Sequence, residues 1–217
     1  MPDDRTALAE VERVAIALYD GFDELDGVGP YEVLRNAASH GVSLSVRLCT
    51  LGSADEVRAN HGLRVVPDAS LAESDPGLLV IPGGGWNDRS EAGARAEVSK
   101  GTLPDAISAH HDSGGLVASV CTGGMIVAAT GLLDGRPAIT HHGAIDDLRE
   151  RGADVIDARV VDDGDLLTAG GVTSGIDLAL YLVERIAGEE LTNEVAREME
   201  YERAADVYRA DPESSVE

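Results

Sequence analysis

The stretch LVASVCTGGMIVAATGL, residues 116–132, contains the change of pattern from which the fold of this chain is inferred. Residues 116–120 form a short apolar run typical of a buried strand, and Cys121 stands where that run ends. Small residues follow at 122–124, and the pattern predicts a helix over 122–130. A buried strand that turns directly into a helix is how an α/β protein exposes a nucleophile on a tight elbow.

Apolar runs and helical periodicity alternate along the rest of the chain. The predicted strands are 11–19, 43–50, a hairpin of 57–59 and 63–66, 78–81, 116–120, 137–140 and a strand pair within 157–168. The predicted helices are 30–39, 91–111 with an interruption near Pro104, 122–130, 144–151, 174–187 and 189–208. This alternation predicts a doubly wound, mostly parallel sheet with helices on both faces.

One domain is expected from the length of 217 residues. Its predicted extent is 11–208, with an acidic N-terminal extension over 1–10 and a frayed acidic tail over 209–217. The first residues are acidic and lack the basic and apolar layout of a signal peptide, so we expect a cytoplasmic protein.

The charge of the chain is extreme, with 40 acidic residues against 17 basic ones and a net charge of −23. Such a surface repels phosphate groups, so neither nucleic acid nor an anionic membrane is an expected partner. Acidic residues spread along the whole chain suit a high-salt cytoplasm, where self-repulsion is screened. Equal stability in dilute buffer and in molar KCl would contradict this halophilic interpretation.

Three loops with reactive or polar residues follow predicted strands, at 20–30, 82–88 and 121–124. Since the carboxyl ends of parallel strands share one edge of the sheet, these loops are expected at one rim. The third loop places Cys121 at a helix N-terminus, where backbone amides are expected to lower the pKa of its thiol. The alternative for Cys121 is an ordinary buried core cysteine.

The other candidate site residues belong to the same rim. Asp26 begins the turn into a helix, and a carboxyl beside a thiolate has a raised pKa and can donate a proton at neutral pH. The run Gly83, Gly84 and Gly85 can present amides to a developing oxyanion or form a plain loop, and Gly123 lets backbone approach closely. His141 and His142 follow a predicted strand and can reach the rim. No histidine spacing matches a known ligand pattern, so no metal is expected.

Dinucleotide and phosphate-loop motifs are absent from the sequence. After Gly83 to Gly85 the position of a third fingerprint glycine is occupied by Asp88, and after Gly27 and Gly29 it is occupied by Glu32. No cofactor is therefore expected.

These segments resemble the ThiJ/PfpI superfamily, and most closely its isocyanide hydratase branch. The resemblance lies in ELDGVGPYEVL (24–34), VIPGGG (80–85), ASVCTGGMIVAATGLLDGRPAITHH (118–142) and RVVDDGDLLTAGGVTSGIDLAL (159–180). It implies a flavodoxin-like fold and a homodimer that acts on a small molecule.

The resemblance also implies residue roles. Cys121 would be the nucleophile, Asp26 its acidic partner, and Gly84 with the amide of Thr122 the oxyanion pocket. Thr122 is typical of hydratase-like members, whereas protease-like members carry histidine there. His141 matches a histidine found near the cysteine in several branches, and His142 stands where similar hydratases carry tryptophan.

Three functions stay open at this point. The first is a lyase in which the cysteine thiolate attacks an isocyanide and a carboxyl supplies the proton. The second keeps this nucleophile for a glyoxalase-like, amidase or peptidase reaction. The third is a redox-sensing or chaperone-like stress protein in which Cys121 is oxidised without turnover.

Overall fold

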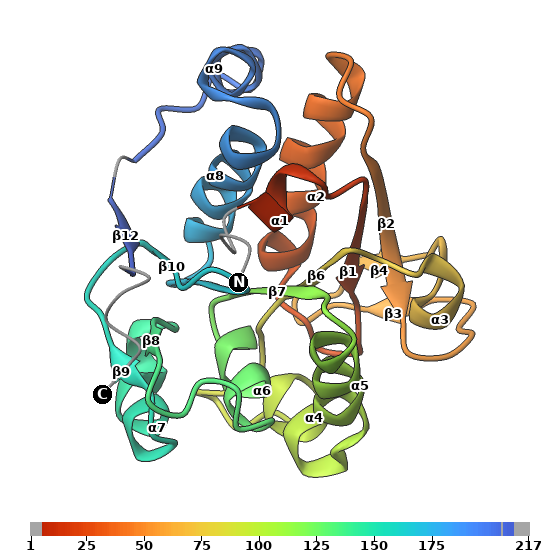
Figure 1. The fold of residues 1–217 in the computed structure, drawn as a ribbon. Coiled ribbons are helices and arrows are strands. Elements are labelled where there is room, and N and C mark those ends of the chain that lie inside the picture. The colour runs from red at the N-terminus through yellow and green to blue at the C-terminus, as the bar shows by residue number, and fades with distance from the viewer. Residues whose placement is uncertain (1–5, 205, 211–217) are drawn as a thin grey trace.

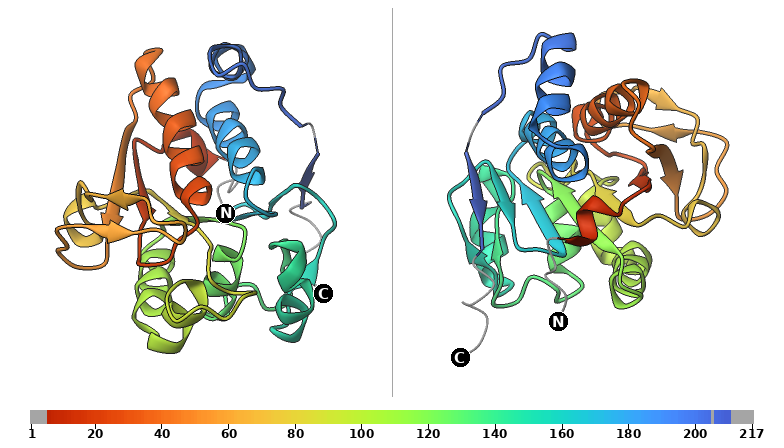
Figure 2. Two further views of the ribbon diagram at one scale, coloured as in Figure 1. Left: turned by 180° about the vertical axis from the view of Figure 1, so that it is seen from behind. Right: turned by 45° about the horizontal axis from the view of Figure 1, so that its top comes forward.

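An eight-stranded sheet lies at the centre of the computed structural model, which describes residues 6–204 and 206–210 (Figure 1). In spatial order its strands are β12 (Val207–Arg209), β10 (Val160–Asp162), β11 (Leu166–Ala169), β7 (Leu116–Val120), β6 (Leu78–Ile81), β1 (Arg13–Ala17), β2 (Ser45–Thr50) and β5 (Ala69–Ser70). Neighbouring strands are parallel except β10 and β11, which form an antiparallel hairpin. The view in the right panel of Figure 2 shows β12 beside β10 at one end of the sheet.

Helices cover both faces of the sheet, which confirms the predicted architecture. They are α1 (Thr6–Ala9), α2 (Glu24–Ser39), α3 (Leu71–Ser74), α4 (Ala94–Lys100), α5 (Thr102–Asp112), α6 (Gly123–Ala128), α7 (Ile145–Glu150), α8 (Ser174–Ala187) and α9 (Glu189–Glu198), with a 3-10 turn η1 (His142–Ala144). In Figure 1, α2, α8 and α9 lie above the sheet and α4, α5 and α6 lie below it. None of the helices in the described part of the chain is long and apolar enough to cross a bilayer.

Two small pairs of strands complete the fold. The hairpin of β3 (Val57–Arg58) and β4 (Arg64–Val65) is the predicted one. The strand predicted at 137–140 is short: β8 (Pro137–Ala138) pairs with β9 (Asp154–Val155) outside the main sheet.

The helix predicted to begin at Pro30 begins six residues earlier, at Glu24. Asp23 caps it, since the Asp23 side chain accepts a hydrogen bond from the Leu25 N–H. Gly27 and Gly29, which made this stretch look like a loop, lie where other side chains pack closely against the helix. A Cβ on Gly29 would lie 3.3 Å from the Ile176 side chain of α8, so tertiary packing outweighs the low helix propensity.

The predicted interruption near Pro104 falls at Gly101 instead. Gly101 ends α4 in the left-handed conformation, with φ of 78°, and α5 begins at the next residue. Pro104 lies in the first turn of α5, where a missing N–H costs little.

The last predicted helix is also shorter than expected. α9 ends at Glu198, Glu200 has a φ of 48°, and the chain then returns to the sheet as β12. Tyr201 and Ala204 hydrogen-bond the buried carboxylate of Asp177, which holds this segment against α8.

The predicted terminal segments lie partly outside the described residues. Within the predicted extension, residues 6–9 form α1 and Leu8 is buried in the core. Of the predicted tail, Arg209 ends β12, whereas 211–217 are outside the described residues.

The order of the strands shows which part of the sheet edge carries the candidate site. β1 pairs with β2 on one side and with β6 on the other, so the chain changes winding direction beside β1. The carboxyl ends of β1, β6 and β7 carry the three loops singled out from the sequence.

Candidate active site

Cys121 occupies a strained turn between β7 and α6. Its φ is 56°, a left-handed conformation that residues with a side chain rarely adopt. The Cys121 N–H donates to the carbonyls of Ala169 (3.1 Å) and Gly170 (2.9 Å), and the Thr140 hydroxyl donates to the Cys121 carbonyl at 2.7 Å. These bonds hold the strained conformation, so the elbow predicted from the sequence is present.

Two glycines allow the elbow to contact the loop after β6. A Cβ on Gly83 would lie 2.5 Å from the Thr122 nitrogen, and one on Gly123 would overlap the Ile81 carbonyl oxygen. Neither position has room for a side chain, although neither needs a positive φ. Close backbone contact is thus the reason for glycine at both positions.

Asp26 lies in the first turn of α2 and is fully buried. Its Oδ2 accepts the Gly83 N–H at 2.9 Å, while Oδ1 has no conventional hydrogen-bond partner. The weak S–H donor of Cys121 is the side chain that interacts with this carboxyl. Burial and the negative charge of Asp23 raise the pKa of Asp26 from 3.8 to about 7, although the Gly83 amide and the thiol act in the opposite direction.

The thiol of Cys121 has a raised pKa, contrary to the expectation from its place at a helix N-terminus. Burial and the neighbouring Asp26 charge raise the pKa of Cys121 from 9.0 to about 12. The amides of Val172 and Thr122 hydrogen-bond the sulfur and favour the thiolate, but they are outweighed. The resting site therefore keeps its proton on sulfur until the proton can pass to a neighbour.

The loop of Gly83, Gly84 and Gly85 closes over the elbow. The Gly84 N–H donates to the Thr122 hydroxyl at 2.9 Å, so in this state it does not face an empty anion pocket. Gly84 and Gly85 have φ values of 125° and 66°, and a Cβ on Gly84 would lie 2.5 Å from the Asp23 nitrogen. An oxyanion role for this loop stays a prediction, whereas the Thr122 amide does face the sulfur.

His141 lies beside the elbow and His142 lies at the surface. The Nδ1 of His141 accepts the Gly143 N–H at 3.0 Å, so its proton is placed on Nε2. Burial and the neighbouring His142 lower the pKa of His141. The His141 ring packs on Gly171, since a Cβ added to Gly171 would lie 2.7 Å from the His141 Cδ2. The exposed ring of His142 lies tilted against the His141 ring, with the two ring centroids 4.1 Å apart. His141 is thus the histidine that adjoins the segment around the cysteine.

Two further residues near the site were not predicted from the sequence. Tyr19 follows β1, and its hydroxyl donates to the Pro82 carbonyl at 2.6 Å. Burial, then Asp26 and other acidic groups, hold its pKa well above the usual value. Its place at the end of a buried strand was the available signal.

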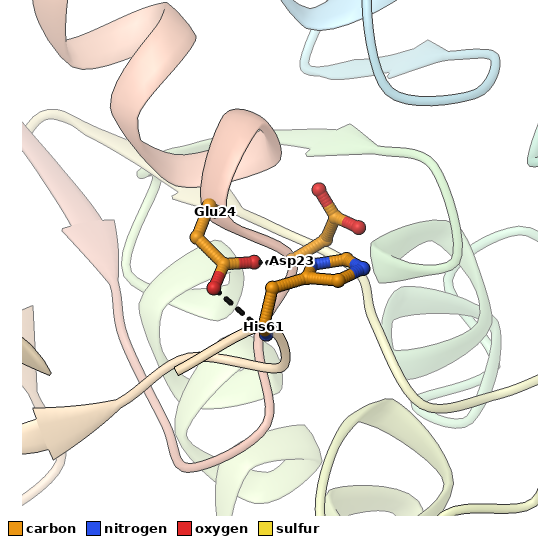
Figure 3. A group of neighbouring side chains, drawn as sticks. All are labelled: Asp23, Glu24 and His61. Carbon is orange, nitrogen blue, oxygen red and sulfur yellow. Dashed lines mark hydrogen bonds and ion pairs between the residues drawn. The ribbon is translucent and has the colours of Figure 1, made fainter. Parts of the chain in front are cut away.

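The second unpredicted residue is His61, in the turn between β3 and β4 (Figure 3). Its Nδ1 pairs with Glu24 at 2.7 Å, and the same carboxylate accepts the N–H groups of His61 (2.7 Å) and Leu63 (3.3 Å). Asp23 adds a third side chain whose ligand-type atom lies within 4.8 Å of the other two. These bonds tie the hairpin to the start of α2. No local sequence pattern connects residues 37 positions apart.

Comparisons with known proteins agree with the resemblance seen in the sequence. The model of the DJ-1/PfpI family matches residues 12–185. The isonitrile hydratase of Pseudomonas putida is 32% identical over 205 residues, which cover 94% of this chain and 84% of that protein. The glutathione-independent glyoxalase DJR-1.2 of Caenorhabditis elegans is 28% identical over 67% of this chain and 75% of its own.

A solved structure supports the same relationship. A ThiJ/PfpI family protein from Pseudomonas syringae superposes with a TM-score of 0.76 at 29% identity, covering 94% of this chain and 83% of its own. With the doubly wound sheet and the cysteine elbow in place, the chain belongs to the DJ-1/PfpI family.

Proposed function

We propose that this chain is a cysteine-dependent hydratase that converts small isocyanides, R–N≡C, into N-substituted formamides. The observation that carries the proposal is the buried pair of Cys121 and Asp26. The carboxyl has one oxygen without a conventional partner and a pKa of about 7, beside a sulfur on a strained turn. Similarity to the isonitrile hydratase of Pseudomonas putida over 94% of the chain supports the choice of substrate class.

The first step forms a bond between the sulfur of Cys121 and the terminal carbon of the isocyanide. The thiol proton passes to the Asp26 carboxylate as sulfur attacks, and Asp26 delivers it to the same carbon. The product of this step is an enzyme-bound thioimidate, Cys–S–CH=N–R, with Asp26 again ionised.

The second step consumes water. Water adds across the C=N bond, with hydroxyl on carbon and hydrogen on nitrogen. The C–S bond then breaks to leave R–NH–CHO, and the proton lost from oxygen returns to the pair of Asp26 and sulfur. The sum is one isocyanide and one water for one formamide.

Thr122 argues against the peptidase alternative. A peptidase needs a base beside its nucleophile, whereas the Thr122 hydroxyl accepts the Gly84 N–H and so orders the loop. The neighbouring His141 uses Nδ1 as an acceptor and keeps only Nε2–H to offer a substrate. That is a hydrogen-bond donor rather than a base.

The test compares the wild-type chain with Cys121→Ala and Cys121→Ser in molar KCl. Cyclohexyl isocyanide is the probe, and the formyl proton of the product is followed by NMR. Turnover by the wild type and none by either variant is expected. Equal turnover by Cys121→Ala would overturn the proposal.

A glyoxalase-like reaction on a 2-oxoaldehyde is the second candidate, because a glyoxalase of Caenorhabditis elegans is also similar to this chain. The same three proteins are therefore assayed with methylglyoxal, following its conversion to lactate. Cysteine-dependent turnover of methylglyoxal with none of isocyanide would replace the first proposal by the second.

A further inference from the structure

The segment Gly170 to Thr173 approaches Cys121 from the end of β11. Val172 has a φ of 41°, which is strained for a β-branched residue, and its N–H hydrogen-bonds the Cys121 sulfur. The carbonyl of Gly170 accepts the Cys121 N–H at 2.9 Å. One short segment thus contacts both the backbone and the sulfur of the nucleophile.

Arg159 holds this segment at both ends. Its carbonyl accepts the Gly170 N–H at 3.1 Å, and its Nη2 donates to the Thr173 hydroxyl at 2.9 Å. The two bonds flank the strained Val172. Strain of this kind persists only where the surroundings over-determine the conformation, and Arg159 supplies bonds of that sort.

The guanidinium of Arg159 is itself held in place by a buried carboxylate. Its Nε donates to Asp177 of α8, which is 1% exposed and also accepts the Tyr201 hydroxyl and the Ala204 N–H, both at 2.9 Å. The fork of an arginine can bond Asp177 and Thr173 together, whereas a lysine ammonium lacks this fixed geometry. Arg159 therefore joins a rigid buried carboxylate to the segment that touches the sulfur.

We propose that Arg159 is a positioning residue, which acts through Thr173 to hold the Val172 amide against the sulfur of Cys121. The inference rests on the proposed function only in taking Cys121 as the nucleophile. Arg159 does not touch the reacting atoms. Its effect is on the fraction and placement of the thiolate.

The test removes the hydrogen bond between Arg159 and Thr173 without disturbing the ion pair of Arg159 with the buried Asp177. Thr173→Val keeps the shape of an exposed side chain but loses its hydroxyl, while Thr173→Ser keeps the hydroxyl. The readout is the rate of alkylation of Cys121 by iodoacetamide across pH, with the labelled peptide identified by mass spectrometry. This separates Cys121 from Cys49, a second buried free cysteine, which lies in β2. Asp26 of α2 and Tyr19 at the end of β1 are the titratable groups that interact with the thiol, and both stay in place.

Thr173→Val is expected to alkylate about tenfold more slowly at neutral pH, with its pH profile moved upward, because a hydrogen bond to the charged sulfur is weakened. The kcat for isocyanide should fall by a similar factor at unchanged KM, and Thr173→Ser should restore both. Arg159→Lys should behave like Thr173→Val. Arg13→Gln, which breaks an exposed arginine–aspartate pair with Asp75, is the matched control and should match the wild type.

If Cys121 in Thr173→Val is alkylated at the wild-type rate, the proposal is overturned. An equal loss of alkylation rate in Thr173→Val and Thr173→Ser would overturn it too. A lower melting temperature of Thr173→Val and Arg159→Lys, with no change in the pH profile of alkylation, would assign Arg159 a merely structural role. If isocyanide is not turned over but alkylation responds as expected, the proposed substrate fails and the positioning role stands.

Discussion

Two carboxylates in the first turn of α2, two residues apart, have opposite titration behaviour. Asp26 is fully buried, and burial raises its pKa to about 7. Glu24 is partly exposed; burial alone would raise its pKa, but hydrogen bonds from the His61 side chain and from backbone N–H groups lower it. The same helix end therefore holds one carboxyl that keeps a proton and one that gives it up readily.

The difference shows that burial and hydrogen-bond partners, rather than the helix dipole, decide these two pKa values. Both residues lie in the first turn, where the helix N-terminus favours negative charge. Glu24 receives donors at both oxygens, whereas Asp26 receives a conventional hydrogen bond at only one. Incomplete hydrogen bonding makes Asp26 suited to proton transfer, and complete hydrogen bonding makes Glu24 an anchor for the hairpin.

The largest expected effect separates the two residues by activity. Asp26→Asn removes the proposed proton carrier and should lower kcat for isocyanide by about 10²- to 10⁴-fold. Glu24→Gln keeps acceptors for the hairpin amides and should change kcat by less than about twofold. Steady-state kinetics measures both. Comparable losses in the two variants would remove the distinction drawn here.

The second effect is on stability and has opposite signs at the two positions. The folded protein holds the Asp26 proton to about pH 7, whereas the unfolded chain loses it near 3.8. Between these values the folded state binds more protons, so the free energy of unfolding falls as pH rises, and it is level above that window. The shift corresponds to about 4 kcal/mol.

Asp26→Asn should therefore be more stable than the wild type by up to about 4 kcal/mol at pH about 8, with little gain near pH about 4. The lowered pKa of Glu24 has the reverse consequence: its stabilisation is present above the unfolded pKa and is lost as pH falls through the folded one. Urea unfolding across pH measures both variants. A destabilised Asp26→Asn at high pH would show that the buried charge is better compensated than its contacts indicate.

The third effect concerns the pH dependence of turnover. In the proposed mechanism the pair of Asp26 and Cys121 is inactive with two protons and active with one. The value of kcat/KM should therefore rise with pH through about 7 and stay level above it. Asp23 is the charge that helps raise the Asp26 pKa. Asp23→Asn keeps the helix cap and should move the midpoint down by less than about one pH unit. If the midpoint does not move, burial is the whole cause of the raised pKa of Asp26.

The sheet and the cysteine elbow were predictable because each depends on local pattern. Residues 78–81 are wholly apolar, 116–120 are apolar except for Ser119, and both segments are wholly buried. The change to small residues after Cys121 marks the turn. The expectation that three loops share one rim followed from parallel strands alone. The hydrogen bond from the Gly83 N–H to Asp26 confirms it for the segments that follow β1 and β6.

The remainder depends on contacts between distant residues. The start of α2 was misplaced because Gly27, Gly29 and Pro30 are poor helix formers whose positions are settled by packing. The sign of the Cys121 pKa shift was wrong because burial, which no sequence pattern measures, exceeds the effect of two amides. The bonds of His61 to Glu24 and of Arg159 to Thr173 join residues 37 and 14 positions apart, so neither could be found from spacing.

The smallest expected effect distinguishes the two carboxylates by their response to salt. His61 is exposed and its pKa is raised by its bond to Glu24, so ions in solution can screen this pair. Raising KCl to about 1 M, where the Debye length is about 3 Å, should return the His61 pKa toward its ordinary value. The midpoint of the activity profile should move less, because Asp26 is out of contact with solvent. NMR titration of the His61 ring beside the pH–rate profile gives both quantities. A midpoint that moves as far as the His61 pKa would mean that long-range surface charge, rather than burial and its nearest neighbours, sets the protonation of Asp26.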